Sequence, residues 1–262
     1  MSKVKSKEEI SGHIDNSLNK LNSLLNSYLE SDEYSVISKA DKLSYWIEDY
    51  TKFLTYEPNF KPDKLKRYKR GEIIKVHLGY KIGSEEGGLH YCAVLDKNNS
   101  IKNPTITVIP LTSLKEHVDI HNLPLGSVYL GNSLYTAMFA KLSLLENIQK
   151  EKLDDLTQKV TELATQITAS SSNELADKFK TLIDNHKKEI VAIRMQQRFI
   201  EKVKKESIKM NKGSIALVSQ ITTISKLRIY DPKTNFDILS KIKLSNENLD
   251  SIDYEIKKLF LR

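Results

Sequence analysis

The chain has 262 residues, of which 39% are hydrophobic and 29% charged, as in a folded protein with a large solvated surface. The single cysteine excludes an internal disulfide, and no run approaches the roughly 20 apolar residues that span a bilayer. The first residues also lack the apolar core of a signal peptide, so we expect a cytoplasmic protein. Residues 1–60 hold 7 basic and 10 acidic side chains (net −3), and residues 61–262 hold 34 and 24 (net +10), which favours a polyanionic partner.

Residues 1–66 are expected to form a helical module. Apolar residues recur at spacings of three and four from Ile10 to Tyr28 and again from Ile37 to Leu54, which predicts two helices that pair as a hairpin. Two prolines then interrupt the pattern, and the run KPDKLKRYKR over residues 61–70 is strongly basic. We place a domain boundary in this run.

From residue 71 the apolar pattern changes to that of strands. Strands are predicted at 72–78, 90–96, 105–112 and 127–131, separated by turn residues. The pattern resumes after residue 212 with GSIALVSQITTIS, and ENLDSIDYEIKKLFLR predicts a final helix. Short strands at this spacing are typical of a small barrel or a half-open sheet. Cys92 lies in an apolar run, where a small core residue is the simple interpretation and a nucleophile the alternative.

A long helical pattern interrupts these strands. Leu153, Leu156 and Val160 continue a stripe with spacings of three and four, and a second stripe follows the polar break ASSSNE. We therefore predict an antiparallel coiled-coil hairpin over 134–211, inserted into a β-rich body formed by 67–133 and 212–262. The expected fold class is α+β.

The β-rich body resembles the MazF/PemK family of toxin endoribonucleases. The family pattern G-S-E-x-G-G, followed by a strand with x-R-P, is similar to GSEEGG and GLHYCAV here. The family block Q-[IV]-[RK]-[ST]-I-D-x-x-R is similar to Gln220–Arg228, which reads QITTISKLR. The order of these motifs, with IPLTS between them, carries the resemblance over about 118 residues of the body.

The resemblance implies an SH3-like barrel that forms a homodimer and cleaves single-stranded RNA without a metal or other cofactor. In that reaction the ribose 2′-OH attacks the phosphorus and leaves a 2′,3′-cyclic phosphate. The chemistry needs a group that takes the 2′-OH proton and donors that stabilise the charge on phosphorus. A protein antitoxin is expected to cover the same surface.

His90 and Thr112 are the catalytic candidates that the resemblance implies. His90 stands where the family has its catalytic arginine, and a histidine is suited to proton transfer near neutral pH. Its alternative role is a structural or ligand-contacting histidine. The hydroxyl of Thr112, in IPLTS, would hold a phosphate oxygen, or it simply caps the end of a strand. The neighbouring Ser113 is a substitute for it.

The substrate-binding candidates lie in the glycine-rich loop, in the block Gln220–Arg228 and in the basic run over residues 61–70. The resemblance implies that the loop closes over RNA, and its glycines permit unusual backbone angles or close contacts. A plain hairpin loop is the alternative. The arginine of the final block matches a family arginine, and the basic run before the first strand could line an RNA groove. These candidates are Ser84, Glu85, Gly87, Gly88, Arg228, Arg67 and Arg70.

The leading hypothesis is therefore a metal-independent endoribonuclease that acts as a toxin or an anti-phage effector. Two substitutions favour a non-catalytic module that binds RNA or a protein: His90 replaces the family arginine, and Ser219 stands where some members have an acid. An inhibitor of a DNA enzyme is a further alternative, since the gyrase poison CcdB shares the architecture. The acidic residues 1–60 suggest regulation of the basic body in cis.

Overall fold

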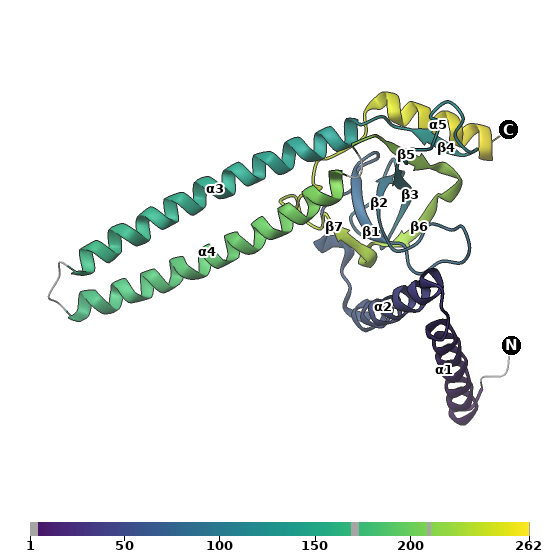
Figure 1. The fold of residues 1–262 in the computed structure, drawn as a ribbon, viewed down its shortest axis with the longest axis horizontal. Coiled ribbons are helices and arrows are strands. Elements are labelled where there is room, and N and C mark those ends of the chain that lie inside the picture. The colour runs from purple at the N-terminus through teal and green to yellow at the C-terminus, as the bar shows by residue number, and fades with distance from the viewer. Residues whose placement is uncertain (1–4, 169–172, 209–210, 262) are drawn as a thin grey trace. The chain divides into compact units, whose positions relative to one another are not determined.

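The computed structural model describes residues 5–168, 173–208 and 211–261. The described chain combines long helices with an antiparallel sheet, so the α+β class is confirmed (Figure 1). Backbone contacts group the residues up to Phe60 with Leu78–Gly88, and group Lys61–His77 with the residues from Leu89 onward. The division into three domains stays a prediction.

The first unit contains helices α1 (Lys7–Leu29) and α2 (Tyr34–Tyr56), as the apolar stripes predict. A capping box starts α1, because the Ser6 side chain accepts from Glu9 N and the Glu9 carboxylate accepts from Ser6 N. No described residue of α1 is buried, and its apolar stripe stays 44–58% exposed at Ile10, Ile14 and Leu18. The packing of the two helices as a hairpin therefore stays a prediction.

The second unit is built on a seven-stranded antiparallel sheet. Its strands are β1 (Ile73–His77), β2 (Leu89–Val94), β3 (Thr105–Ser113), β4 (Ser127–Tyr129), β5 (Ser214–Leu217), β6 (Thr222–Ser225) and β7 (Ile229–Asp231). The strand order is β4-β5-β3-β2-β1-β7, with β6 also paired to β3. No pairing between described residues joins the two end strands. The sheet is not closed in the described chain, and the barrel implied by the resemblance stays a prediction.

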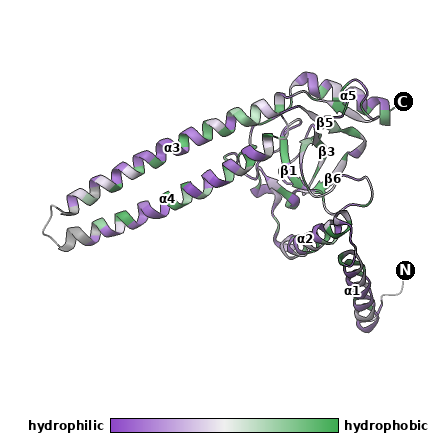
Figure 2. Ribbon diagram, viewed as in Figure 1, coloured by the Kyte–Doolittle hydropathy of each residue, from purple (hydrophilic) through white to green (hydrophobic). Residues whose placement is uncertain are grey.

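Both faces of the central strands are buried, which explains their nearly continuous apolar sequence (Figure 2). Ile73, Ala93 and Leu111 belong to the main core on one face. Successive residues face opposite sides of a sheet, so Ile74 and Cys92 lie on the other face, each with no exposed surface. Cys92 is a small core residue, as its sequence context suggests.

Helices α3 (Ser133–Thr168) and α4 (Asn173–Ile208) form the predicted helical segment. Each has 36 residues, which corresponds to about 54 Å at 1.5 Å per residue. They run side by side in opposite directions (Figure 1); coiled-coil packing along their length stays a prediction. The start of α3 and the end of α4, called the root of the pair below, belong to the body. Their residues Met138, Leu142, Ile200 and Val203 are part of the main core.

The final helix α5 (Asn246–Phe260) packs on the same core. Ser245 caps its first turn by accepting from Asn248 N at 3.3 Å, and the buried Ile252 faces the sheet. Within the described ranges, no helix is long and apolar enough to cross a membrane.

Candidate active site

The strand register brings the two catalytic candidates together. His90 lies directly opposite Val76 of β1, and Tyr91 lies opposite Leu111 of β3. The next step of this antiparallel register places His90 opposite Thr112. Residues that face each other in this way share one side of the sheet, with Cα atoms roughly 4.5–5.5 Å apart. The arrangement lies at the edge of the sheet where β1 and β3 end and β2 begins.

His90 and Thr112 lie at the rim of the buried face. Both are half-buried, while Val76 and Cys92 on the same face are fully buried. An imidazole and a hydroxyl on adjacent strands offer one group that can exchange a proton and one that can donate a hydrogen bond to an oxygen. This pair can therefore act on a phosphodiester placed over the rim.

Arg228 is held close to the same edge. Its Nε donates to the carbonyl oxygen of His77, the last residue of β1, at 2.7 Å. Ile229 lies opposite Val76, so the backbone at Arg228 is two strands away from His90, or about 10 Å at the usual strand spacing. The guanidinium is a permanent positive charge that is anchored near the candidate pair.

Ser113 does not share the face of Thr112, because adjacent strand residues point to opposite sides. It lies opposite Ser214 of β5, which is fully buried. Thr112, and not its neighbour, is therefore the hydroxyl beside His90.

The loop Leu78–Gly88 joins β1 to β2 and ends two residues before His90. Ser84 and Glu85 are exposed, and Gly88 has φ +79°. Gly88 N donates to the carbonyl oxygen of Gly79 at 2.7 Å, and a Cβ at Gly87 would lie 2.8 Å from that same oxygen. Gly88 thus adopts a left-handed backbone angle and Gly87 allows a close backbone contact, as the sequence suggests.

Arg70 lies before the first residue of β1, while His90 pairs with the other end of that strand. Its guanidinium donates to the carbonyl oxygen of Leu95 and pairs with Asp253 of α5. These contacts tie the body together, and the structure does not bring Arg70 beside His90. Arg67 is exposed.

Residues 69–183 match the family model described as PemK-like, MazF-like toxin of type II toxin-antitoxin system. This region is PemK-like and MazF-like. The match covers β1 to β4, the loop and both catalytic candidates, and it ends within α4. The block Gln220–Arg228 lies outside it. No curated protein gives a significant match to the chain.

The second unit also carries charged residues on the face opposite His90. Lys75 is buried, with its Nζ 5.2 Å from the centre of the Tyr91 ring. Asp231 of β7 lies opposite Lys75, and burial raises the pKa of its carboxyl to about 6. The only indication of Lys75 and Asp231 in the sequence is that Lys75 interrupts the apolar run EIIKVHL. Their position inside the second unit indicates a structural role.

Tyr129 is a further residue near the site that the sequence did not single out. It lies opposite Ile215, which in turn lies opposite Thr112, so Tyr129 and Thr112 share a face two strands apart. Its hydroxyl donates to the carbonyl oxygen of Lys212 at 3.3 Å. In the described parts of the chain, no three His, Cys, Asp or Glu side chains are grouped so that they could hold a metal ion.

Proposed function

We propose that this chain is a metal-independent endoribonuclease toxin that cleaves single-stranded RNA at the rim formed by His90 and Thr112. The observation that carries the proposal is the register of β1, β2 and β3, which sets these residues on one face within the PemK/MazF-like region. The family description connects the region with toxins of type II toxin-antitoxin systems.

In the proposed reaction His90 accepts the proton of the ribose 2′-OH as its oxygen attacks the phosphorus. The P–O5′ bond breaks, the 5′-oxygen takes a proton from water, and the products are a 2′,3′-cyclic phosphate and a 5′-OH. The Thr112 hydroxyl donates to a non-bridging oxygen, and the Arg228 guanidinium stabilises the added negative charge. The proton that His90 gained returns to solvent before the next turnover.

The loop Leu78–Gly88 is proposed to contact the RNA through Ser84 and Glu85, since it is continuous with the strand that carries His90. The net charge of +10 on residues 61–262 attracts the phosphate backbone, and Arg67 is an exposed cation of that body. A protein antitoxin and a second copy of the chain are the proposed partners, as the resemblance implies.

The decisive experiment incubates the purified protein with a long RNA in EDTA and identifies the new ends. We expect cyclic-phosphate ends, and we expect His90→Ala to lower the cleavage rate by about 10²–10⁴, the usual contribution of a positioned proton-transfer group. Thr112→Ala should lower it as well. The matched controls are His117→Ala and Thr105→Ala, which remove an exposed histidine and an exposed threonine of β3.

Cleavage that is lost in EDTA and restored by a divalent ion would contradict the metal-independent reaction. RNA that stays intact with the wild-type protein would instead support the non-catalytic alternative, a module that binds RNA or protein. The replacement of the family arginine by His90 is the observation that favours this alternative.

A further inference from the structure

Strand β4 is an open edge of the sheet. It is the first strand in the sheet order and pairs only with β5 among the described strands. Leu130 N donates to the carbonyl oxygen of Ser214 at 2.9 Å, so the bonds to β5 are made by Val128 and Leu130, and the N–H and C=O of Tyr129 point away from β5. Such edges are usually blocked by charges or proline, and Ser127–Tyr129 carry neither.

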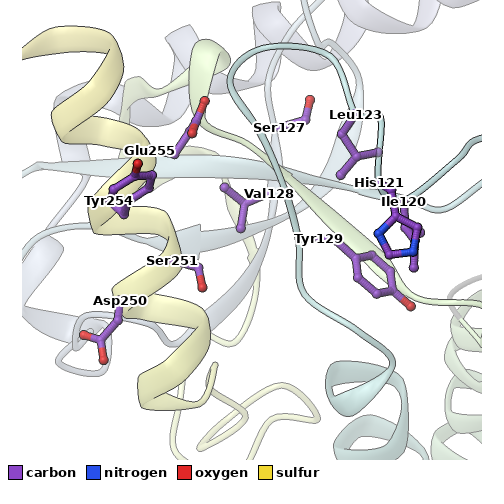
Figure 3. Close-up of a pocket in the computed structure, with 10 residues that line it drawn as sticks. All are labelled: Ile120, His121, Leu123, Ser127, Val128, Tyr129, Asp250, Ser251, Tyr254 and Glu255. Carbon is purple, nitrogen blue, oxygen red and sulfur yellow. The ribbon is translucent and has the colours of Figure 1, made fainter.

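A cavity of ≈ 590 Å³ lies along this edge (Figure 3). In Figure 3, α5 forms one wall with Ser251 and Tyr254, and the loop before β4 forms the other wall with Ile120 and Leu123. Val128 lies between the two walls, and Tyr129 lies beside Ile120 and His121. The exposed Tyr254 and Ile120 make this cavity suitable for an apolar side chain.

The residues around Tyr129 hold its side chain and backbone in position. A Cβ at Gly213 would meet the Tyr129 ring, and Gly213 has φ +121°, so the glycine gives the ring its space. Gly126 at the other end of β4 has φ +80°, and its N–H donates to the buried Glu255 at 3.0 Å. The edge is thus held in place at both ends before any partner binds.

The carboxylates that line the cavity distinguish between a peptide and a nucleic acid as its occupant. Asp250 and Glu255 of α5 both line it. Glu255 also bonds Gly126 and lies 3.6 Å from Lys258, whereas Asp250 is exposed and pairs with no cation in the described ranges. A carboxylate here repels the phosphates of a nucleic acid and attracts a basic side chain. The observations therefore favour a peptide over RNA.

We propose that β4 and this cavity bind an extended segment of a partner protein, which adds to the sheet as an antiparallel strand. One residue of the segment pairs through both main-chain groups with Tyr129, its apolar side chain enters the cavity, and a nearby lysine or arginine faces Asp250. The proposal does not depend on ribonuclease activity.

The probe is a phage-displayed library of random peptides, selected on the immobilised full chain. We expect enrichment of sequences with an apolar residue flanked by lysine or arginine. A selected peptide is then synthesised with and without an N-methyl group at each backbone position. One N-methyl position should lower the affinity about tenfold or more, because it removes a main-chain bond and adds a clash at the edge.

Variants of the chain test the same contact from the other side. Tyr129→Pro removes the outward N–H, and Tyr129→Ala is its control, which loses the ring and keeps the N–H. Asp250→Asn should weaken binding of the basic peptide several-fold, whereas Asp154→Asn on α3 should have no effect. The N-methyl series needs no variant, so it decides the question even where Tyr129→Pro does not fold.

The proposal is overturned by any of four results. The first two are a library that yields no binder and binders that tolerate N-methylation at every position. The third is a dimer of the chain that dissociates when Tyr129 is changed to proline. The fourth is an oligonucleotide whose binding is lost in Tyr254→Ala. The third result would assign the edge to a second copy and the fourth to RNA.

Discussion

Several charged side chains of this protein are buried in the fold. Lys66 and Glu72 form a buried ion pair at 2.6 Å, and Lys226 is 2% exposed with its Nζ bonded to the carbonyl oxygen of Ser100. Buried charges are costly unless they are paired and hydrogen-bonded. Burial lowers the pKa of the Lys226 ammonium and raises the pKa of the Asp231 carboxyl, because it disfavours the charged form of each group.

Asp231 should make stability depend on pH. Its carboxyl has a pKa of about 6 in the folded protein against an ordinary value of 3.8, so the folded state holds more protons between these values. Stability therefore falls as the pH rises from about 4 to about 6 and stays lower above it, by up to about 3 kcal/mol. Asp231→Asn should abolish this decrease and raise the free energy of unfolding at pH 7.

Urea unfolding at a series of pH values measures the effect, with the exposed Asp154→Asn as the control. Burial, the largest cause, and the charge of Asp237 raise the pKa of this carboxyl, and the positive charges of Lys75 and Lys141 lower it in part. A lower stability of Asp231→Asn at pH 7 would show that the ionised form is the one that the fold favours.

Among the elements, α3 and α4 have two different environments along their length. Leu142 is fully buried in the main core, whereas Leu144, two residues later, is 58% exposed. The helices thus begin as part of the body and continue as a separate pair, whose facing positions include the buried Leu156 and Ile193. The root of the insertion contributes to the stability of the sheet.

Leu142→Ala should lower the free energy of unfolding of the body by about 2–5 kcal/mol, because it leaves a cavity in the core. Leu144→Ala is the matched control and should change it by less than about 0.5 kcal/mol. Hydrogen exchange of the amides of β3 provides the readout. If Leu142→Ala left that exchange unchanged, the insertion would be a separate folding unit down to its root.

At the scale of the whole molecule, the first 60 residues differ in charge from the rest of the chain. Residues 1–60 carry a net charge of −3, and residues 61–262 carry +10. Backbone contacts group the loop Leu78–Gly88 with the N-terminal helices. Regulation in cis by the N-terminal helices is therefore a testable hypothesis.

Deletion of residues 1–60 should raise the rate of RNA cleavage several-fold, because it removes acidic groups that compete with phosphate for the basic body. A full-length variant with Asp15→Asn, Asp41→Asn and Glu48→Gln should give part of the same increase. The increase should diminish at high salt. An unchanged rate in both proteins would refute the electrostatic form of the hypothesis.

Much of the fold was predictable from apolar spacing. The predicted strands at 72–78, 90–96, 105–112 and 127–131 overlap β1 to β4, and the long helical segment corresponds to α3 and α4. GSIALVSQITTIS was less predictable, since β5 and β6 within it pair with different parts of β3. A run of apolar and β-branched residues does not reveal where a strand changes partner.

The sequence by itself determined the residue types of the candidate site, the alternation of helical and strand-like segments and the family resemblance. These follow from local spacing and motif order. Only the tertiary structure decided that His90 and Thr112 are cross-strand neighbours, that Ser113 faces away, and that β4 pairs with β5 alone among the described strands. Register and strand order depend on contacts between residues far apart in the chain, and no short stretch of sequence contains that information.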